Sequence, residues 1–148
     1  MDATKLHLLL NYIPLIVTPV GAFMLLYGSR RSRPKAQKTG LVLLVLMAVV
    51  TLGVFGTGEV AGKGSDLIIG PVWANIQQHK VSAFPSFAVI ESLGIFALYG
   101  LINLMRQKAL ATWFMAIIMI LSITALVLTA RTAYLGRHIY TLDDPTAK

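Results

Sequence analysis

The chain has 148 residues, of which 56% are hydrophobic and only 13% are charged, and its mean hydropathy is +0.73. A soluble globular domain carries about 25% charged residues, so this composition is typical of a membrane protein. The absence of cysteine excludes disulfides, thiolate metal ligands and iron–sulfur clusters. The formal net charge is +7, and the positions of the charges decide its meaning.

Four apolar stretches follow one another along the chain, and each predicts a transmembrane helix. Crossing the hydrocarbon takes about 20 residues, with a range of about 17–25. The predicted helices cover about residues 5–28, 39–57, 80–105 and 109–134. We expect an all-α, four-transmembrane-helix bundle, with residues 1–148 forming a single integral membrane domain and residues 135–148 a short outer tail. We expect the first helix to be retained, because its apolar run is longer than that of a signal peptide and no basic segment precedes it.

The basic residues predict the orientation. The loop GSRRSRPKAQK after the first helix has five Lys and Arg residues, and the loop RQK after the third helix has two. Neither loop has an acidic residue, and short loops rich in Lys and Arg stay in the cytoplasm. Both termini are therefore expected on the outer, periplasmic side of a bacterial inner membrane, which the chain crosses several times. The charge needs no nucleic-acid partner to explain it.

The first apolar stretch, LHLLLNYIPLIVTP, carries polar residues that a membrane helix rarely accepts. His7 and Asn11 are four residues apart and share one helix face, which continues to Pro14. Polar side chains inside a membrane usually face the interior of a bundle, so we expect this stripe to point inward. In the alternative, Asn11 bonds backbone carbonyls that the proline frees, and His7 lies in water at the interface.

The predicted orientation places all three histidines on the outer side. His7 and His79 are candidate axial ligands of a b-type haem, with Asn11 and Arg131 beside it. His7, His79, Glu59 and His138 are alternatively ligands of a transition metal. The competing interpretation has His79 as a polar residue at the start of a helix and no cofactor. Arg131 then caps the end of the fourth helix or pairs with Glu59.

Glu91 lies near the predicted membrane midplane. If the third helix begins near Lys80, Glu91 is about 16 Å along it. An ionisable side chain there costs several kcal/mol unless it is neutral or paired, and it indicates a functional site. Three roles remain open: a proton relay, a hydrogen bond to a quinone, or a structural hydrogen bond in the neutral form.

The sequence contains no catalytic motif. Its serines do not form a G-x-S-x-G elbow, and its glycines do not form a phosphate-binding loop. Asp143 and Asp144 are its only adjacent carboxylates, and they lie in the tail. Enzymatic activity therefore stays open, and a non-catalytic role is favoured.

Four motifs together, LHLLLNYIP, TGEVAG, QQHK and ARTAYLGRHIY, resemble an uncharacterised bacterial family of small four-helix membrane proteins, a domain of unknown function. The resemblance covers nearly the whole chain. Family members show HLLLNHIP, TGE, His-Glu and ART-x-LGG-x-IRH-x-E, which implies a histidine and carboxylate site at the outer face. This chain keeps several of those residues: His7, Asn11, Pro14, Glu59, His79, Arg131 and Gly136. It departs from the pattern at Tyr12, Lys80, Arg137, Tyr140 and Thr141. The missing residues include two of the family's histidines, which would reduce a multi-ligand metal site but leave His7 and His79 for a haem.

These observations predict an accessory, non-catalytic subunit of a respiratory or photosynthetic electron-transfer complex, with a b-type haem near the outer face. Its expected partners are the lipid bilayer and either other membrane subunits or further copies of itself. One alternative is a stand-alone carrier of a metal or haem. Others are a structural scaffold, or a small channel or transporter with an inner polar path from Asn11 past Glu91 to Asn103.

Overall fold

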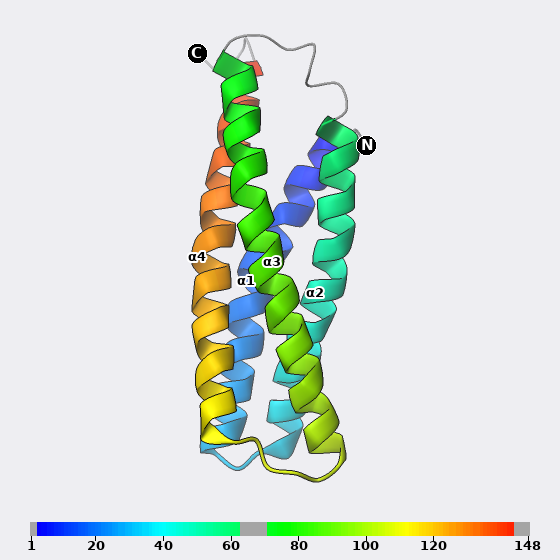
Figure 1. Cartoon of the computed structure of the whole chain (residues 1–148), viewed down its shortest axis with the longest axis vertical. Helices are drawn as coiled ribbons and strands as arrows, with labels where there is room; N and C mark the ends of the chain where they lie inside the picture. The colour runs from blue at the N-terminus through cyan, green and yellow to red at the C-terminus, as the bar shows by residue number, and fades with distance from the viewer. Residues whose placement is uncertain (1–2, 63–70, 144–148) are drawn as a thin grey trace.

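The chain folds into four helices, which confirms the all-α prediction (Figure 1). The computed structural model describes the backbone of residues 3–62 and 71–143, and within it the side chains of residues 10, 12–58 and 73–137. Each helix contains a segment that is long and apolar enough to cross a membrane. The helices are α1 (Ala3–Arg30), α2 (Pro34–Gly62), α3 (Pro71–Met105) and α4 (Thr112–Asp143).

The helices form an antiparallel bundle in which α1 and α3 each pack against both α2 and α4. The beginning of α1 and the end of α4 lie at one end of the bundle, called here the terminal end (Figure 1). The turn between α1 and α2 and the turn between α3 and α4 lie at the other, called the turn end. Both basic loops therefore lie on the same side, as the charges predict. The assignment of that side to the cytoplasm stays a prediction.

The helices are longer than the apolar stretches that predict them. α3 begins nine residues before the predicted Lys80, and α4 continues nine residues past the predicted Tyr134. Hydropathy marks the hydrocarbon-spanning part only, whereas polar residues such as Gln and Arg also favour helix. Pro71 and Pro34 occupy the first positions of α3 and α2, where proline's fixed φ and missing N–H are tolerated.

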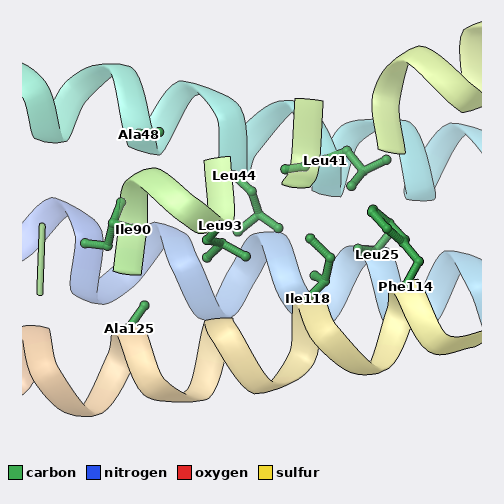
Figure 2. Packing of buried hydrophobic residues seen from close by; sticks show 10 residues of the cluster. Leu25, Leu41, Leu44, Ala48, Ile90, Leu93, Phe114, Ile118 and Ala125 are labelled. Carbon is green, nitrogen blue, oxygen red and sulfur yellow. The ribbon is translucent and has the colours of Figure 1, made fainter. Parts of the chain in front are cut away.

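An apolar core fills the centre of the bundle (Figure 2). Leu25 of α1, Leu41 of α2 and Phe114 of α4 meet near the turn end. Small residues bring the helices close together. A Cβ added to Gly40 of α2 would lie 2.6 Å from the backbone carbonyl oxygen of Gly21 and 2.6 Å from the amide nitrogen of Leu25. Only glycine fits there, so α1 and α2 pack backbone to backbone in this half of the bundle.

Large apolar side chains are exposed on all four helices. They include Ile16 and Phe23 on α1, Val49 on α2, Val81 and Ile95 on α3, and Ile120 and Ile123 on α4. A soluble bundle covers its outer faces with polar residues, whereas lipid accepts apolar ones. The surface of the bundle is thus compatible with a multi-pass membrane protein.

The two turns at the turn end have the same hydrogen-bond pattern. The amide of Arg33 donates to the carbonyl of Gly28 at 2.8 Å, and the amide of Lys108 donates to the carbonyl of Asn103 at 2.9 Å. Each bond closes a six-residue helix end in which the fifth residue is left-handed: Ser32 has φ 51° and Gln107 has φ 57°. Both basic turns are therefore held by backbone bonds.

Candidate functional site

His79 lies in the third turn of α3, and its ring is fixed against α4. The Nδ1 atom of His79 is 3.0 Å from the carbonyl oxygen of Thr132. A carbonyl oxygen only accepts hydrogen bonds, so Nδ1 carries the proton and donates it. In a neutral imidazole the lone pair then belongs to Nε2. Histidines that bind metal or haem commonly have this arrangement, because the Nδ1–H bond orients the ring for ligation through Nε2.

A ladder of buried hydroxyl groups continues from His79 along the α3–α4 interface. The hydroxyl oxygens of Ser82 and Thr132 are 3.0 Å apart, and those of Ser86 and Thr129 are 3.1 Å apart. The Thr132 hydroxyl also lies 3.0 Å from the carbonyl oxygens of Ser82 and Leu128. In a membrane such interhelical bonds satisfy groups that lipid cannot. We call Ser82, Ser86, Thr129 and Thr132 the hydroxyl seam. It fixes α3 against α4 on the turn-end side of His79.

The remaining residues of the predicted outer site lie on helices near the terminal end. His7 and Asn11 are on α1, Glu59 is on α2 and His138 is on α4, but their side chains lie outside the described part of the structure. Their predicted contacts therefore stay predictions. In Figure 1 the first turns of α1 lean toward α2 and away from the outer parts of α3 and α4.

Arg131 is exposed on α4, next in sequence to Thr132. It lies three turns before the end of α4 at Asp143, so it does not cap the helix. Within the described residues, no group of three or more His, Asp or Glu side chains could hold a metal ion. A metal site would have to include side chains outside the described residues, such as the predicted ligands His7, Glu59 and His138.

Glu91 lies on the side of α3 that faces α2. Phe87, one turn before it, stacks on Phe55 of α2 with ring centroids 4.4 Å apart. Gly94, nearly one turn after it, packs against Ala48 of α2. Because the two helices are antiparallel, Glu91 lies level with the segment of α2 between these residues. Glu91 is also near the middle of the apolar span Trp73–Met105, and its depth near a membrane midplane stays a prediction.

The Glu91 carboxyl group is incompletely bonded. Its side chain is partly buried, and Oε1 is enclosed without a hydrogen-bond partner among the described protein atoms. The hydroxyl of Thr51, at the same level of α2, donates instead to the carbonyl of Met47 at 2.8 Å. In a bilayer, enclosing a carboxyl oxygen without a hydrogen-bond partner is unfavourable. An apolar residue in a purely structural role would avoid this free-energy cost.

The polar path proposed for a channel is not continuous along α3. Glu91 and Asn103 are twelve residues apart, which separates them by about 120° around a helix. The two side chains therefore face different neighbours. Thr18 of α1 is the other buried polar side chain with an unpartnered oxygen in the described structure, and it is only 1% exposed.

Two glycines form an open strip on the outward-facing side of α2. A Cβ added at Gly53 or Gly56 would meet nothing within 4 Å. They continue the exposed positions Leu46 and Val49 at spacings of three or four residues, which is the spacing of a helix-packing seam. Leu46, Val49, Gly53 and Gly56 are called the α2 outer strip below.

The hydroxyl seam was not predicted from the sequence, and the GVFG glycines, Gly53 and Gly56, were interpreted only as allowing close packing or a tight turn. The hydroxyl seam has a signal in the sequence, because Ser82 and Ser86 are four residues apart, and Thr129 and Thr132 are three apart, on apolar helices. The partner helix of each pair follows only from the three-dimensional packing. A glycine that faces lipid cannot be distinguished in the sequence from one that faces another helix of the same chain, such as Gly40.

Comparison of the chain with models of protein families, with curated proteins and with solved structures gave no significant match.

Proposed function

We propose that this protein is an accessory membrane subunit that packs against helices of an electron-transfer complex through the α2 outer strip. The observation that carries the proposal is the open space beside Gly53 and Gly56 on a surface otherwise covered by large apolar side chains. Small residues let the backbones of two membrane helices approach closely, and this close approach is a main source of affinity between such helices. Lipid alone gives no reason to keep two glycines there, where each weakens the helix by about 1 kcal/mol relative to alanine.

Glu91 supports the same interpretation, because it lies beside α2 at the level of this segment and its Oε1 atom lacks a partner within the described structure. We propose that a helix of another subunit supplies the missing donor. The proposal that the complex transfers electrons rests on the predicted histidine site at the outer face, and not on the α2 outer strip.

The assembly is tested by replacing glycines in the α2 outer strip. A tagged chain is expressed in its host, extracted in mild detergent and separated on a native gel, with the co-migrating proteins identified. We expect the wild-type chain in a larger assembly and the Gly53→Leu/Gly56→Leu variant as the free chain. Ala116→Leu/Ala130→Leu is the matched control, because both alanines are exposed on α4.

The result discriminates between the candidate roles. Equal migration of the two leucine variants would refute the role of the α2 outer strip. Recovery of only further copies of the same chain would replace the accessory subunit by a homo-oligomer. To distinguish a homo-oligomer from an assembly with other subunits, two differently tagged copies of the chain are co-expressed in the same cells. Recovery of one tag with the other identifies the homo-oligomer.

A second function, binding of a b-type haem near the terminal end, is favoured by the bond from His79 to Thr132. His79 fits an axial ligand because its Nδ1–H is donated to a backbone carbonyl. His7 is the second proposed ligand, and Arg131 is a candidate partner for a propionate. When bound, such a haem supplies one-electron chemistry. The protein's own part is to hold the imidazole ring in one orientation, through Thr132 and the hydroxyl seam.

The haem proposal is tested by a reduced-minus-oxidised absorption spectrum of the purified protein, together with metal analysis. We expect a haem band that is lost in His7→Ala and in His79→Ala. His138→Ala is the histidine control and should keep the band. A protein with neither a Soret band nor stoichiometric metal has no such cofactor, and a band that survives both substitutions has other ligands.

A further inference from the structure

The positive charge of the protein is concentrated at the turn end of the bundle. Seven of the thirteen Lys and Arg residues lie there, and all seven are exposed: Arg30, Arg31, Arg33, Lys35, Lys38, Arg106 and Lys108. The six acidic residues lie elsewhere, since residues 28–58 and 92–142 contain none. The turn end therefore carries a formal charge of +7, which equals the net charge of the whole chain.

The backbone adds to this positive potential. α2 and α4 both begin at the turn end, and a helix amino terminus has a partial positive charge. The first intrahelical amide bonds there run from Gln37 to Arg33 and from Met115 to Ala111. Pro34 has no amide N–H, so the amides of Lys35 and Ala36 in α2 and those of residues 112–114 in α4 lie in a first turn without an intrahelical acceptor. Such amides are suited to bind the oxygens of an anion.

Exposed aromatic rings define the depth at which these charges lie. Tyr27 is 45% exposed and lies three residues before Arg30. Trp113 is 58% exposed and lies five residues after Lys108, and Tyr99 is 53% exposed on α3. Tyrosine and tryptophan prefer the level of the lipid headgroups, where one part of the ring is apolar and another is wet. The cations beyond the rings then face the phosphate layer.

We propose that the turn end is a binding surface for the headgroups of anionic phospholipids, formed jointly by the α1–α2 turn and the α3–α4 turn. The ligand chemistry is a phosphodiester that bears net negative charge, presented at the membrane surface. Arg31 and Arg33 contribute from one turn, and Arg106 and Lys108 from the other. The two hydrogen-bonded helix ends hold these turns, so the cations are presented by ordered backbone. The proposal is independent of the accessory-subunit and haem proposals.

The two tryptophans allow a direct test. Trp113 lies at the turn end and Trp73 lies near the terminal end, so each reports on one membrane surface. Trp73→Phe protein is reconstituted into bilayers of phosphatidylcholine with a minor fraction of phosphatidylglycerol. Bromine is placed at a shallow acyl position of either one lipid or the other, and quenching of Trp113 fluorescence is compared at equal mole fraction of brominated lipid.

We expect brominated phosphatidylglycerol to quench Trp113 several-fold more efficiently than brominated phosphatidylcholine, and this preference to fall as salt is added. Trp113→Phe protein, in which Trp73 reports, should show no comparable preference. Neutralising four cations, in Arg31→Gln/Arg33→Gln/Arg106→Gln/Lys108→Gln, should abolish the preference at Trp113. Neutralising Arg131 and Arg137 at the other end should leave it unchanged.

Equal quenching of Trp113 by the two lipids would overturn the proposal, and this comparison needs no charge variant. Loss of the preference on addition of millimolar inorganic phosphate at constant ionic strength would also overturn it, because the surface would then be a site for soluble phosphate. A preference that persists in phosphate and disappears in the four-cation variant supports lipid headgroups as the ligand.

Discussion

One hydrogen bond joins the ring of His79 to the backbone of Thr132, with 3.0 Å between Nδ1 and the carbonyl oxygen. The same threonine uses its hydroxyl group for the hydroxyl seam with Ser82. Backbone and side chain of one residue thus serve two different purposes. A substitution that changes only the side chain of Thr132 can separate them.

Replacing Thr132 by valine should weaken the bundle without releasing His79. The substitution keeps the shape and removes the hydroxyl that bonds Ser82, while the carbonyl that accepts from His79 remains. Interhelical hydrogen bonds in membranes contribute about 0.6 kcal/mol on average and up to about 1.7 kcal/mol. We expect a loss of that size in the free energy of unfolding, measured in mixed micelles. Thr124→Val, on an exposed position of α4, should cost less.

Alanine should have opposite effects at two glycines of α2. At Gly40 the new Cβ would approach backbone atoms of α1 to 2.6 Å, so α1 and α2 must move apart, at a cost of about 1–3 kcal/mol. At Gly53 the new Cβ meets nothing within 4 Å, and the isolated chain should gain up to about 1 kcal/mol from better helix propensity. Thermal unfolding of the two variants in detergent gives the comparison. A loss at Gly53 in the monomer would contradict the open position of this residue.

Glycine at the two left-handed positions should stabilise the protein. Ser32 and Gln107 have φ values of 51° and 57°, and the left-handed region costs an L-residue about 1–2 kcal/mol. Glycine removes this cost but loses about 0.5–1 kcal/mol in chain entropy, so each substitution should gain roughly 0.5–1 kcal/mol. Ser29→Gly, inside the last turn of α1, is the control and should destabilise. Unfolding midpoints of the three variants provide the measurement.

Leucine in place of Glu91 should stabilise the isolated bundle. It removes a carboxyl oxygen that has no partner within the described structure, and an unsatisfied buried polar group costs about 1–3 kcal/mol. Glu91→Gln keeps a polar group and should change the stability less. If the accessory-subunit proposal holds, Glu91→Leu should also weaken assembly on the native gel. A large loss of stability in the monomeric variant would instead show that Glu91 has a structural partner.

The fold could be predicted from the sequence because each helix carries its own hydropathy signal. Lys80 and Tyr134 show the limit of that signal: they mark where the apolar stretch begins or stops, while α3 and α4 continue nine residues beyond them. Helix propensity and packing determine these outer turns, and neither appears in a hydropathy average. Gly136, which can look like a helix stop, is buried within α4.

The candidate site could be predicted only in part. The position of Glu91 near the middle of the apolar span Trp73–Met105 follows from the sequence alone, whereas its depth near a membrane midplane stays a prediction. The carbonyl that fixes His79 belongs to a residue 53 positions away in the sequence, and no spacing rule predicts it. Contacts between helices that are distant in the chain require the packed bundle.

The length of α3 has a consequence for the shape of the protein along the membrane normal. Its 35 residues extend about 52 Å, whereas the hydrocarbon core is about 30 Å thick. A tilt of about 20° shortens this projection by only about 6%. The basic turns are short, so little of the length of α3 extends past the hydrocarbon core at the turn end. Most of the length that exceeds the core thickness therefore extends past it at the terminal end. A water-soluble partner approaching from that side would meet helix ends that extend past the hydrocarbon, with the His79 ring bonded to the backbone of α4.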